Sequence, residues 1–188
     1  MNLMIVKDAF RTAPAATPAK VPADVLAYAI AECALGRVLL ARSAMRVCAI
    51  LIGDGNKELV ADLAARFPES ELDANPAAVR DDLEKVIRFI YTPTVGLYLP
   101  LDMRGTPFQR RVWQKLRAIP AGRTVTYMEL ARWISPFASP RAVAGACAAN
   151  SIALAIPCHR AVCGNTDLAG YHWGIERKRE LIRREAKA

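Results

Sequence analysis

Residues 141–160 read Arg-Ala-Val-Ala-Gly-Ala-Cys-Ala-Ala-Asn-Ser-Ile-Ala-Leu-Ala-Ile-Pro-Cys-His-Arg, and they carry the most informative pattern in the chain. The first ten form a predicted helix of almost nothing but small side chains. The last five place the thiol of Cys158 beside the imidazole of His159, directly after a proline. The thiolate is the reactive form of cysteine, and a nearby histidine or arginine stabilises it. A potential nucleophile next to a nearly bare helix indicates chemistry on a bulky molecule that must approach closely.

Each part of this pattern also has an ordinary structural interpretation. A helix of alanine and glycine can simply pack against a neighbour, a lone cysteine is often a small buried hydrophobe, and Asn150 can be a capping residue. Because adjacent side chains often point apart, we expect Cys158 and His159 to interact through a water. A cysteine–histidine pair also needs a third group to orient the imidazole, and Glu185 in a final helix predicted over Lys178–Ala188 is the candidate.

The charge of the chain is divided unevenly along its 188 residues, a length that allows one good core or two small domains. Residues 1–103 hold 11 Lys and Arg against 13 Asp and Glu, whereas residues 104–188 hold 15 against 5. A one-sided basic region is typical of proteins that bind polyanions, although a basic surface can also serve solubility alone. The charge therefore favours nucleic acid as a partner without deciding the matter.

Several classes of protein do not fit this composition. No apolar run approaches the ~20 residues of a membrane span, and the N-terminus lacks the pattern of a signal peptide. The five cysteines form no CxxC pair and only two histidines exist, which is too few for a convincing structural zinc site. We therefore expect no membrane, metal or cofactor, and reduced thiols in a cytoplasm.

The chain divides into three predicted regions: a flexible tail over 1–22, an N-terminal α/β domain over 23–103 and a C-terminal domain over 104–188. In the N-terminal domain the patterns predict strands over 25–33, 37–42 and 46–52, helices over 56–67 and 76–91, and a strand over 94–101. The first three strands are expected to form a small antiparallel sheet. This domain shows no catalytic constellation and is interpreted as a scaffold.

Capping signals organise the C-terminal domain into short helices. Residues 106–109, Thr-Pro-Phe-Gln, predict a helix that runs to Ile119. Residues 126–129 predict a second helix to about Ile134, and Ser139-Pro140 opens a third from Arg141 to about Ala149. Such an arrangement predicts a helix-turn-helix with the third helix as its recognition helix. That helix carries few side chains that read major-groove edges. Two interpretations stay open: close packing against a neighbouring helix, which the residues alone favour, or a fit to a minor groove with Arg141 entering the base stack.

Taken together, these residues resemble the O6-alkylguanine-DNA alkyltransferase family, and most closely the C-terminal repair domain of Ada-type proteins. The resemblance covers about Val25 to the end and rests on residues 141–143, Asn150, residues 156–160, residues 170–174 and Glu185. The sequence departs from the family at Ala161, where valine is more usual. It also lacks the cysteine cluster of the Ada-type metal-binding domain, so we do not expect a damage-sensing transcriptional role.

The resemblance implies a fold and a reaction. It implies a ribonuclease-H-like α/β scaffold followed by an α-rich winged or helix-turn-helix domain. It implies that Cys158 irreversibly accepts the alkyl group of O6-alkylguanine, or of O4-alkylthymine, once per molecule and after the base has flipped out. His159 would act as the base through water, and Glu185 would orient it.

The family pattern also implies roles around the nucleophile. Asn150 would tie the recognition helix to the active-site loop. Tyr127 would rotate the target nucleotide and donate toward the base, and Arg141 would fill the gap in the duplex. DNA contacts are implied for Arg141, Tyr127, Ala142 and Gly145, and contacts with the flipped base for Tyr171, His172 and Ala161.

The leading hypothesis is thus direct reversal of alkylation damage in the minor groove of double-stranded DNA, by a monomer in the bacterial cytosol. Two alternatives remain at this stage. One is a non-catalytic DNA-binding or regulatory protein, which would not need the thiol. The other is a cysteine–histidine hydrolase, which would turn over repeatedly where an alkyl acceptor is spent after one reaction.

Overall fold

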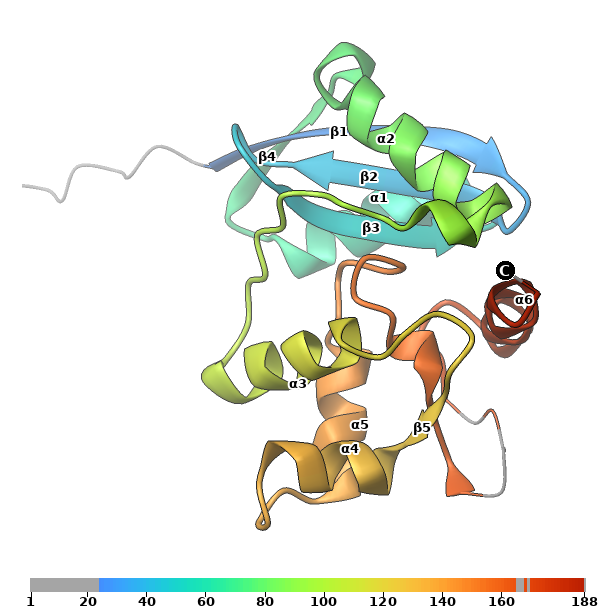
Figure 1. The fold of residues 1–188 in the computed structure, drawn as a ribbon. Coiled ribbons are helices and arrows are strands. Elements are labelled where there is room, and N and C mark those ends of the chain that lie inside the picture. Colours follow the sequence, from blue (N-terminus) through green and yellow to red (C-terminus); the bar gives the residue numbers. More distant parts are fainter. Residues whose placement is uncertain (1–23, 165–167, 169, 188) are drawn as a thin grey trace, which may run out of the picture.

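The computed structural model describes residues 24–164, 168 and 170–187, so the tail predicted over 1–22 lies outside the described residues. Figure 1 shows a sheet with two helices in the upper part of the molecule and a cluster of short helices in the lower part, with α6 beside the sheet. The elements in chain order are β1 (Asp24–Cys33), β2 (Gly36–Arg42), β3 (Val47–Gly53), α1 (Asn56–Arg66), β4 (Ser70–Ala74), α2 (Pro76–Tyr91), the 3-10 helix η1 (Pro93–Val95), α3 (Pro107–Arg117), β5 (Val125–Thr126), α4 (Tyr127–Ile134), α5 (Pro140–Ala148), the 3-10 helix η2 (Cys158–Arg160), β6 (Ala161–Val162) and α6 (Ile175–Glu185).

The large sheet has the strand order β3-β2-β1-β4. The β1–β2 and β2–β3 pairs are antiparallel, as expected, and the register places Cys33 opposite Gly36 across a tight hairpin. Gly36 has φ +100, and a Cβ there would lie 2.6 Å from the carbonyl oxygen of Gly53, so the hairpin requires glycine.

One strand of this sheet was missed, and one predicted strand was wrong. The sheet is mixed, because β4 joins β1 in parallel. This strand has one inward apolar residue, Leu72, among polar neighbours, so it shows no alternating pattern. The strand predicted over 94–101 is absent: η1 occupies its start, and its only strand-like pairing is an isolated bridge between Leu101 and Val47. Pro93 and Pro100 lack the N–H that a ladder requires.

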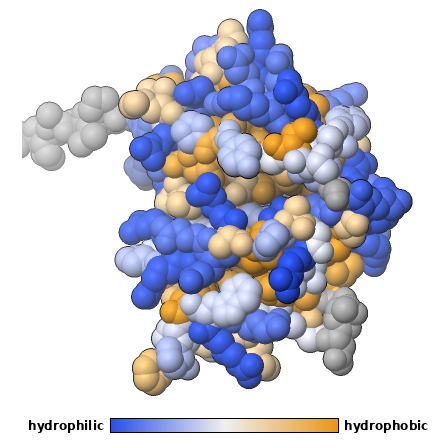
Figure 2. All heavy atoms as spheres, viewed as in Figure 1, coloured by the Kyte–Doolittle hydropathy of each residue, from blue (hydrophilic) through white to orange (hydrophobic). Residues whose placement is uncertain are grey.

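The helices α1 and α2 lie on opposite faces of the sheet, with α2 in front in Figure 1. Both were predicted, and their spacing buries Leu59 and Leu63 on α1 and Val79, Val86 and Ile90 on α2. The same hydrophobic core continues without a break through the sheet, α3, α4 and α5. The N-terminal half is therefore packed directly against the half that carries the cysteine. The face of the molecule seen in Figure 2 carries mainly hydrophilic residues.

The three capped helices of the C-terminal half form as predicted. The capping boxes of α3 and α4 are complete, with Thr106 Oγ1 accepting from Gln109 N at 3.2 Å and Thr126 Oγ1 accepting from Glu129 N at 3.1 Å. The last helix begins at Ile175 rather than at residue 178, because Gly174 takes φ 96 and supplies the N-cap position. None of the described helices combines the length and apolar character needed to cross a membrane.

The free edge of β3 anchors the segment that leads to the cysteine. Ile50 N donates to Ser151 O at 2.9 Å, and Ala153 N donates to Ile50 O at 2.9 Å. These bonds form a parallel bridge between Ile50 and Ile152. The sheet thus holds one end of the 150–158 segment, and that segment presents Cys158 to the rest of the C-terminal half.

Candidate active site

The helix α5 forms one side of the site. Its N-cap is Ser139, whose Oγ accepts from Ala142 N at 3.1 Å, and Pro140 is its first residue. Val143, Ala146 and Cys147 face the core, and the indole of Trp113 on α3 donates to Ala146 O at 2.8 Å. The opposite face is exposed and consists of Arg141, Ala142, Gly145, Ala148 and Ala149. A Cβ added at Gly145 would meet nothing within 4 Å, so this surface of the helix is open and nearly flat.

Asn150 connects α5 to the thiol. Its Nδ2 donates to Ile156 O at 2.9 Å and to Cys158 Sγ at 3.3 Å, and its Oδ1 accepts from Ile152 N at 2.9 Å. The side chain is completely buried and uses every hydrogen on its amide. Burial raises the pKa of Cys158 to about 11, while the Asn150 hydrogen bond and the charge of Lys178 act in the opposite direction. The resting sulfur is therefore a neutral thiol at physiological pH.

His159 belongs to a buried charged network. Its Nε2 lies 2.9 Å from Glu185 Oε1, and the bidentate Arg160 reaches the same carboxylate at 2.9 Å and 2.8 Å. Arg160 also donates to the carbonyl of Ile119. Burial alone would raise the pKa of Glu185, but the bonds from His159 and Arg160 outweigh it and lower that pKa to about 2. The contact between Glu185 Oε1 and His159 Nε2 has the geometry that the prediction required, in which Glu185 orients the imidazole.

The Glu185 contact decides the proton positions on the imidazole. An ionised carboxylate only accepts hydrogen bonds, so Nε2 carries the hydrogen and Nδ1 is left as the basic nitrogen. Burial lowers the pKa of His159, so the ring is neutral at physiological pH. Its Nδ1 is buried and has no hydrogen-bond partner among the described residues. This nitrogen is thus available to accept a proton.

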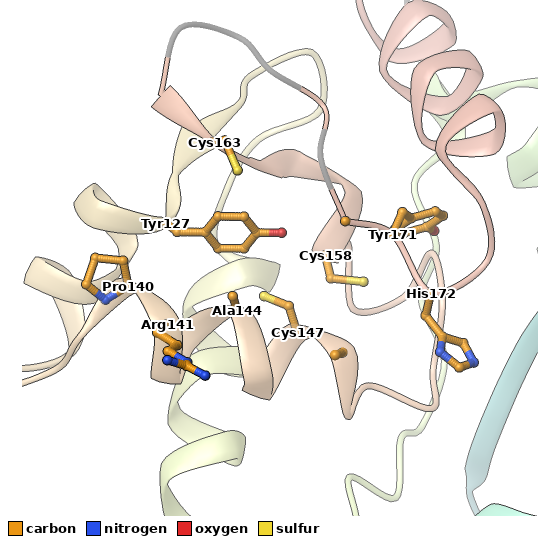
Figure 3. A pocket seen from close by; sticks show the side chains of 11 residues that line it. Tyr127, Pro140, Arg141, Ala144, Cys147, Cys158, Cys163, Tyr171 and His172 are labelled. Carbon is orange, nitrogen blue, oxygen red and sulfur yellow. The ribbon is translucent and has the colours of Figure 1, made fainter.

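A cavity of about 610 Å³ opens over the thiol. In Figure 3 the side chain of Cys158 lies between Tyr127 on one side and Tyr171 on the other, with α5 below. The lining residues are Tyr127, Pro140, Arg141, Ala144, Cys147, Ala148, Cys158, Cys163, Gly170, Tyr171 and His172. Burial raises the pKa of Tyr127 well above its usual value, so its hydroxyl keeps its proton at neutral pH. The volume is within the range of pockets that hold small organic ligands.

The predicted site residues are therefore brought together only in part. Six of the predicted residues do not line the cavity. Asn150, His159 and Glu185 are buried away from solvent. Ala142 and Gly145 lie on the outer surface of α5, and Ala161, which was expected to contact the base, is completely buried in β6. His172 lines the cavity, but its Nε2 faces α1, at 2.6 Å from Arg66 Nη2 and 3.3 Å from Asp62 Oδ2.

Sequence reasoning missed several residues of the site. Cys147 and Cys163 both line the cavity, although neither has a polar activating neighbour in the sequence that would mark it as a site residue. Lys178 is completely buried, and its ammonium donates to Ala161 O at 2.7 Å while lying 5.8 Å from the Tyr127 ring centroid. The one available signal for Lys178 was its place on the same helical face as Leu181 and Glu185. Among the described residues, no cluster of three His, Cys, Asp or Glu side chains is placed to bind a metal ion.

The comparisons with known proteins agree with this geometry. The family model for the DNA-binding domain of 6-O-methylguanine DNA methyltransferase matches residues 107–187. A methylated-DNA–protein-cysteine methyltransferase of Candida albicans is 36% identical over 148 residues, which cover 74% of this chain and 83% of the relative. The chain belongs to the O6-methylguanine-DNA methyltransferase family. The resemblance stated from the sequence is thereby confirmed.

Other members of the family extend the comparison. The bifunctional transcriptional activator and DNA repair enzyme Ada of Escherichia coli is 47% identical over 160 residues, which cover 85% of this chain but 45% of Ada. The chain thus spans less than half the length of the Ada proteins it matches. Among solved structures, the OGT of Mycobacterium tuberculosis in complex with DNA superposes with a TM-score of 0.71 at 28% identity, covering 86% of this chain and 93% of that one. The mixed α/β fold is therefore that of the alkylguanine transferases.

Proposed function

We propose that this protein reverses O6-alkylguanine damage in DNA by moving the alkyl group onto Cys158. The observation that carries the proposal is the position of the Cys158 thiol, at the wall of a cavity of about 610 Å³ between two tyrosines and beside the open face of α5. The family membership adds support, since the Candida albicans relative is named a methylated-DNA–protein-cysteine methyltransferase.

The chemistry is a direct displacement. The thiol proton passes toward Nδ1 of His159 through a water, and the Glu185 carboxylate stabilises the imidazolium that forms. The Cys158 sulfur then forms a bond to the alkyl carbon while the bond from that carbon to guanine O6 breaks. The electron pair stays with the guanine, which takes a proton from the neutral hydroxyl of Tyr127. Because the product is a thioether, one molecule repairs one lesion.

Access to the base completes the proposal. The alkyl group lies inside the duplex, so the nucleotide must leave the stack, at a cost of a few kcal/mol. We propose that the flat exposed face of α5 enters the minor groove and that Arg141, at the mouth of the cavity, occupies the place of the flipped base. Ala142 and Gly145 would then face the groove, whereas Tyr171 and His172 would border the base. Ala161 would act only through its backbone.

The architecture has a corresponding proposal. A ribonuclease-H-like scaffold over residues 23–103 and a DNA-binding domain over 104–188 are supported by the strand order and by the capped helices α3, α4 and α5. A monomer in the bacterial cytosol is part of the same proposal, and the five free cysteines support a reducing compartment.

The test is the intact mass of the protein after incubation with a duplex that contains O6-methylguanine. We expect the mass to rise by one methyl group, located on the Cys158 peptide, and no second methyl when lesion is in excess. Cys158→Ala should show no gain and should still bind the duplex. A folded, reduced wild-type sample that binds the lesion without gaining mass would favour a non-catalytic DNA-binding protein, and repeated turnover would favour a hydrolase.

A further inference from the structure

Arg66, the last residue of α1, makes contacts that the reaction outlined above does not use. Its Nη1 donates to Asn150 O at 3.3 Å and to Ser151 Oγ at 3.2 Å, and its Nη2 lies 2.6 Å from His172 Nε2. The Nε donates to Asp62 Oδ1 at 2.8 Å, one turn back on the same helix. The side chain is only 13% exposed. One guanidinium from the N-terminal half thus touches two separate segments of the C-terminal half.

Both segments belong to the site. The first begins at Asn150, whose amide holds the sulfur of Cys158 and the carbonyl of Ile156. The second carries Tyr171 and His172, which form the cavity wall opposite Tyr127 in Figure 3. A shift of either segment changes the distance between the thiol and the wall against which a base would lie. Displacements of about 1 Å at a reacting centre are enough to slow a reaction by about 100-fold.

The chemistry of arginine suits this position. A guanidinium presents its donors in a rigid planar fork, so a single side chain can bond in several directions at once. The carboxylate of Asp62 fixes the Nε edge and leaves both Nη groups facing the two segments. His172 Nε2 lies closer to Arg66 Nη2, at 2.6 Å, than to Asp62 Oδ2, at 3.3 Å. Because the guanidinium can only donate, Nε2 is the acceptor, and this bond sets the direction of the His172 side chain. A lysine has one flexible ammonium and cannot hold both segments with the same geometry.

The sheet does not replace these contacts. Ile50 on β3 bonds to the backbone of Ser151 and Ala153, and so fixes the start of the first segment after Asn150. The carbonyl of Asn150 and the wall at His172 lie outside that bridge. Arg66 is thus placed to set the position of Asn150 relative to the second segment. The bonds from β3 do not fix the distance between these two parts of the site.

We infer that Arg66 is a positioning residue for the proposed alkyl transfer, through which α1 holds the Asn150–Cys158 segment and the His172 wall in register. Only the expected effect of Arg66 on the rate of alkyl transfer rests on the proposed function. It assigns to the N-terminal half a direct part in shaping the cavity, in addition to its role as a scaffold.

The first experiment compares single-turnover alkyl transfer in wild type, Arg66→Met and Arg66→Lys. Arg66→Met keeps the apolar stem and removes the fork, and Lys57→Met is the matched control because Lys57 is an exposed cation on the same helix. With an O6-methylguanine duplex we expect the maximal rate of Arg66→Met to fall by about 10-fold or more, with little change in the half-saturating DNA concentration. Arg66→Lys should recover part of the rate, and Lys57→Met should match wild type.

A second substrate separates positioning from DNA binding. The free base O6-benzylguanine needs no contact with a duplex, so the same fall in rate is expected with it. A change confined to the half-saturating DNA concentration would overturn the inference and assign Arg66 to DNA binding. Equal maximal rates in Arg66→Met and Lys57→Met would overturn it as well.

Hydrogen exchange provides a measurement that does not depend on the reaction. Arg66→Met should accelerate amide exchange in residues 150–158 and 170–173, whereas α2 should exchange as in wild type. If wild type transfers no alkyl group, the proposed function fails while this comparison still tests the inference. Unchanged exchange in both segments would contradict it, and if Arg66→Met does not fold, Arg66→Lys carries the same measurements.

Discussion

Cys158 is held as a neutral thiol by its own burial. At rest its pKa is about 11, and the Asn150 hydrogen bond is the largest influence that favours the thiolate. Cys158 as a residue is 4% exposed, so it meets few molecules that cannot enter the cavity. The site therefore combines low general reactivity with a nearby amide that favours ionisation of the thiol.

The first prediction concerns this amide. Asn150→Asp keeps the size of the side chain but replaces the donor that faces Cys158 and Ile156 with an acceptor. We expect the pKa of the thiol to rise, alkyl transfer to slow, and the free energy of unfolding to fall by about 1–3 kcal/mol, because buried acceptors lose their partner. Thiol titration and urea unfolding measure the two effects. Asn56→Asp, at the exposed first residue of α1, is the control, since aspartate keeps the acceptor that Arg37 uses at 2.9 Å and suits a helix N-terminus.

The second prediction concerns the buried carboxylate. Glu185→Gln removes the charge that compensates Arg160 and replaces one of the two acceptor oxygens used by His159 and Arg160 with an amide donor. Leaving one partner of a buried ion pair unmatched costs about 3–5 kcal/mol, and we expect that loss in urea unfolding together with slower alkyl transfer. Glu180→Gln on the same helix breaks only surface pairs and should change the stability by less than about 1 kcal/mol. Similar losses in both variants would refute the prediction.

The third prediction follows from the directions of two pKa shifts. Burial lowers the pKa of His159 below its usual 6.5, so below pH 6.5 the unfolded chain binds a proton that the folded chain does not. The lowered pKa of Glu185 acts in the same sense between 4.5 and about 2. Because the unfolded state binds more protons, the free energy of unfolding should decrease as the pH falls through these ranges. Urea titrations across the range measure it, and Glu185→Gln should lose the more acidic part of the dependence.

The role of a residue can be predicted from the sequence when a local pattern determines that role. It cannot be predicted when the role depends on where the residue lies in the folded molecule. Cys158 and Asn150 meet across a short span of chain, but the role of Asn150 at the active-site loop was expected only from the family resemblance. Lys178 lies in a helix crowded with charged side chains, and its burial is decided by packing that no local pattern records. Arg66 and Cys147 likewise reach the site only because of how the halves and helices pack.

Among the elements, α5 has the most distinctive surface. The fourth prediction uses Gly145, where an added side chain meets open space. Gly145→Ala should stabilise the protein by about 0.5–1 kcal/mol, because glycine is unfavourable inside a helix. Gly145→Leu should retain the fold but bind lesion DNA at least about 10-fold more weakly, because the bulk blocks close approach to the groove. Thermal unfolding and DNA titration test both variants.

The control for this prediction is Ala77→Leu, at an exposed position on α2. It adds a similar bulk to a helix that the proposal keeps away from DNA, so its affinity should equal that of wild type. Unchanged affinity in Gly145→Leu would remove α5 from the DNA interface.

Capping chemistry explains which elements could be predicted. The starts of α3, α4 and α5 could be predicted because each depends on a hydrogen bond between a threonine or serine and the first turn of the helix. Four consecutive residues are enough to show such a capping pattern. The strand β4 is different, because Leu72 is its single inward apolar residue and its pairing depends on β1. The segment over 94–101 looked apolar enough for a strand, but a strand also needs an adjacent edge and N–H groups, and Pro100 removes one of them.

For the molecule as a whole, the division of charge gives the fifth prediction. The excess of Lys and Arg over Asp and Glu lies entirely in residues 104–188. Binding to undamaged duplex should therefore weaken steeply as salt rises from about 50 to 200 mM, because bound phosphates release counterions. Fluorescence anisotropy at several salt concentrations measures the slope. The single-turnover rate on the free base O6-benzylguanine should vary little over the same range, which separates DNA binding from chemistry.

The division of the molecule into two halves is less complete than its sequence suggests. The core runs from the sheet into α3 and α5, and β3 bonds directly to the segment that carries the cysteine. Composition and motifs place a boundary near residue 104, but they cannot show that apolar surfaces on its two sides are buried against each other. Predicting that burial requires the relative placement of elements that are far apart in the chain.

The smooth outer face of α5 has a consequence for how lesions would be found. A helix without side chains that contact base edges binds different DNA sequences with similar affinity. The protein would therefore associate with and dissociate from every stretch of duplex equally readily. Discrimination is then deferred to the cavity, where a base is inspected only after it has left the helix. Under the proposed function, such a protein would search a genome without preferring particular DNA sequences. Because each molecule reacts once, the number of unreacted molecules would limit how many lesions a cell can repair.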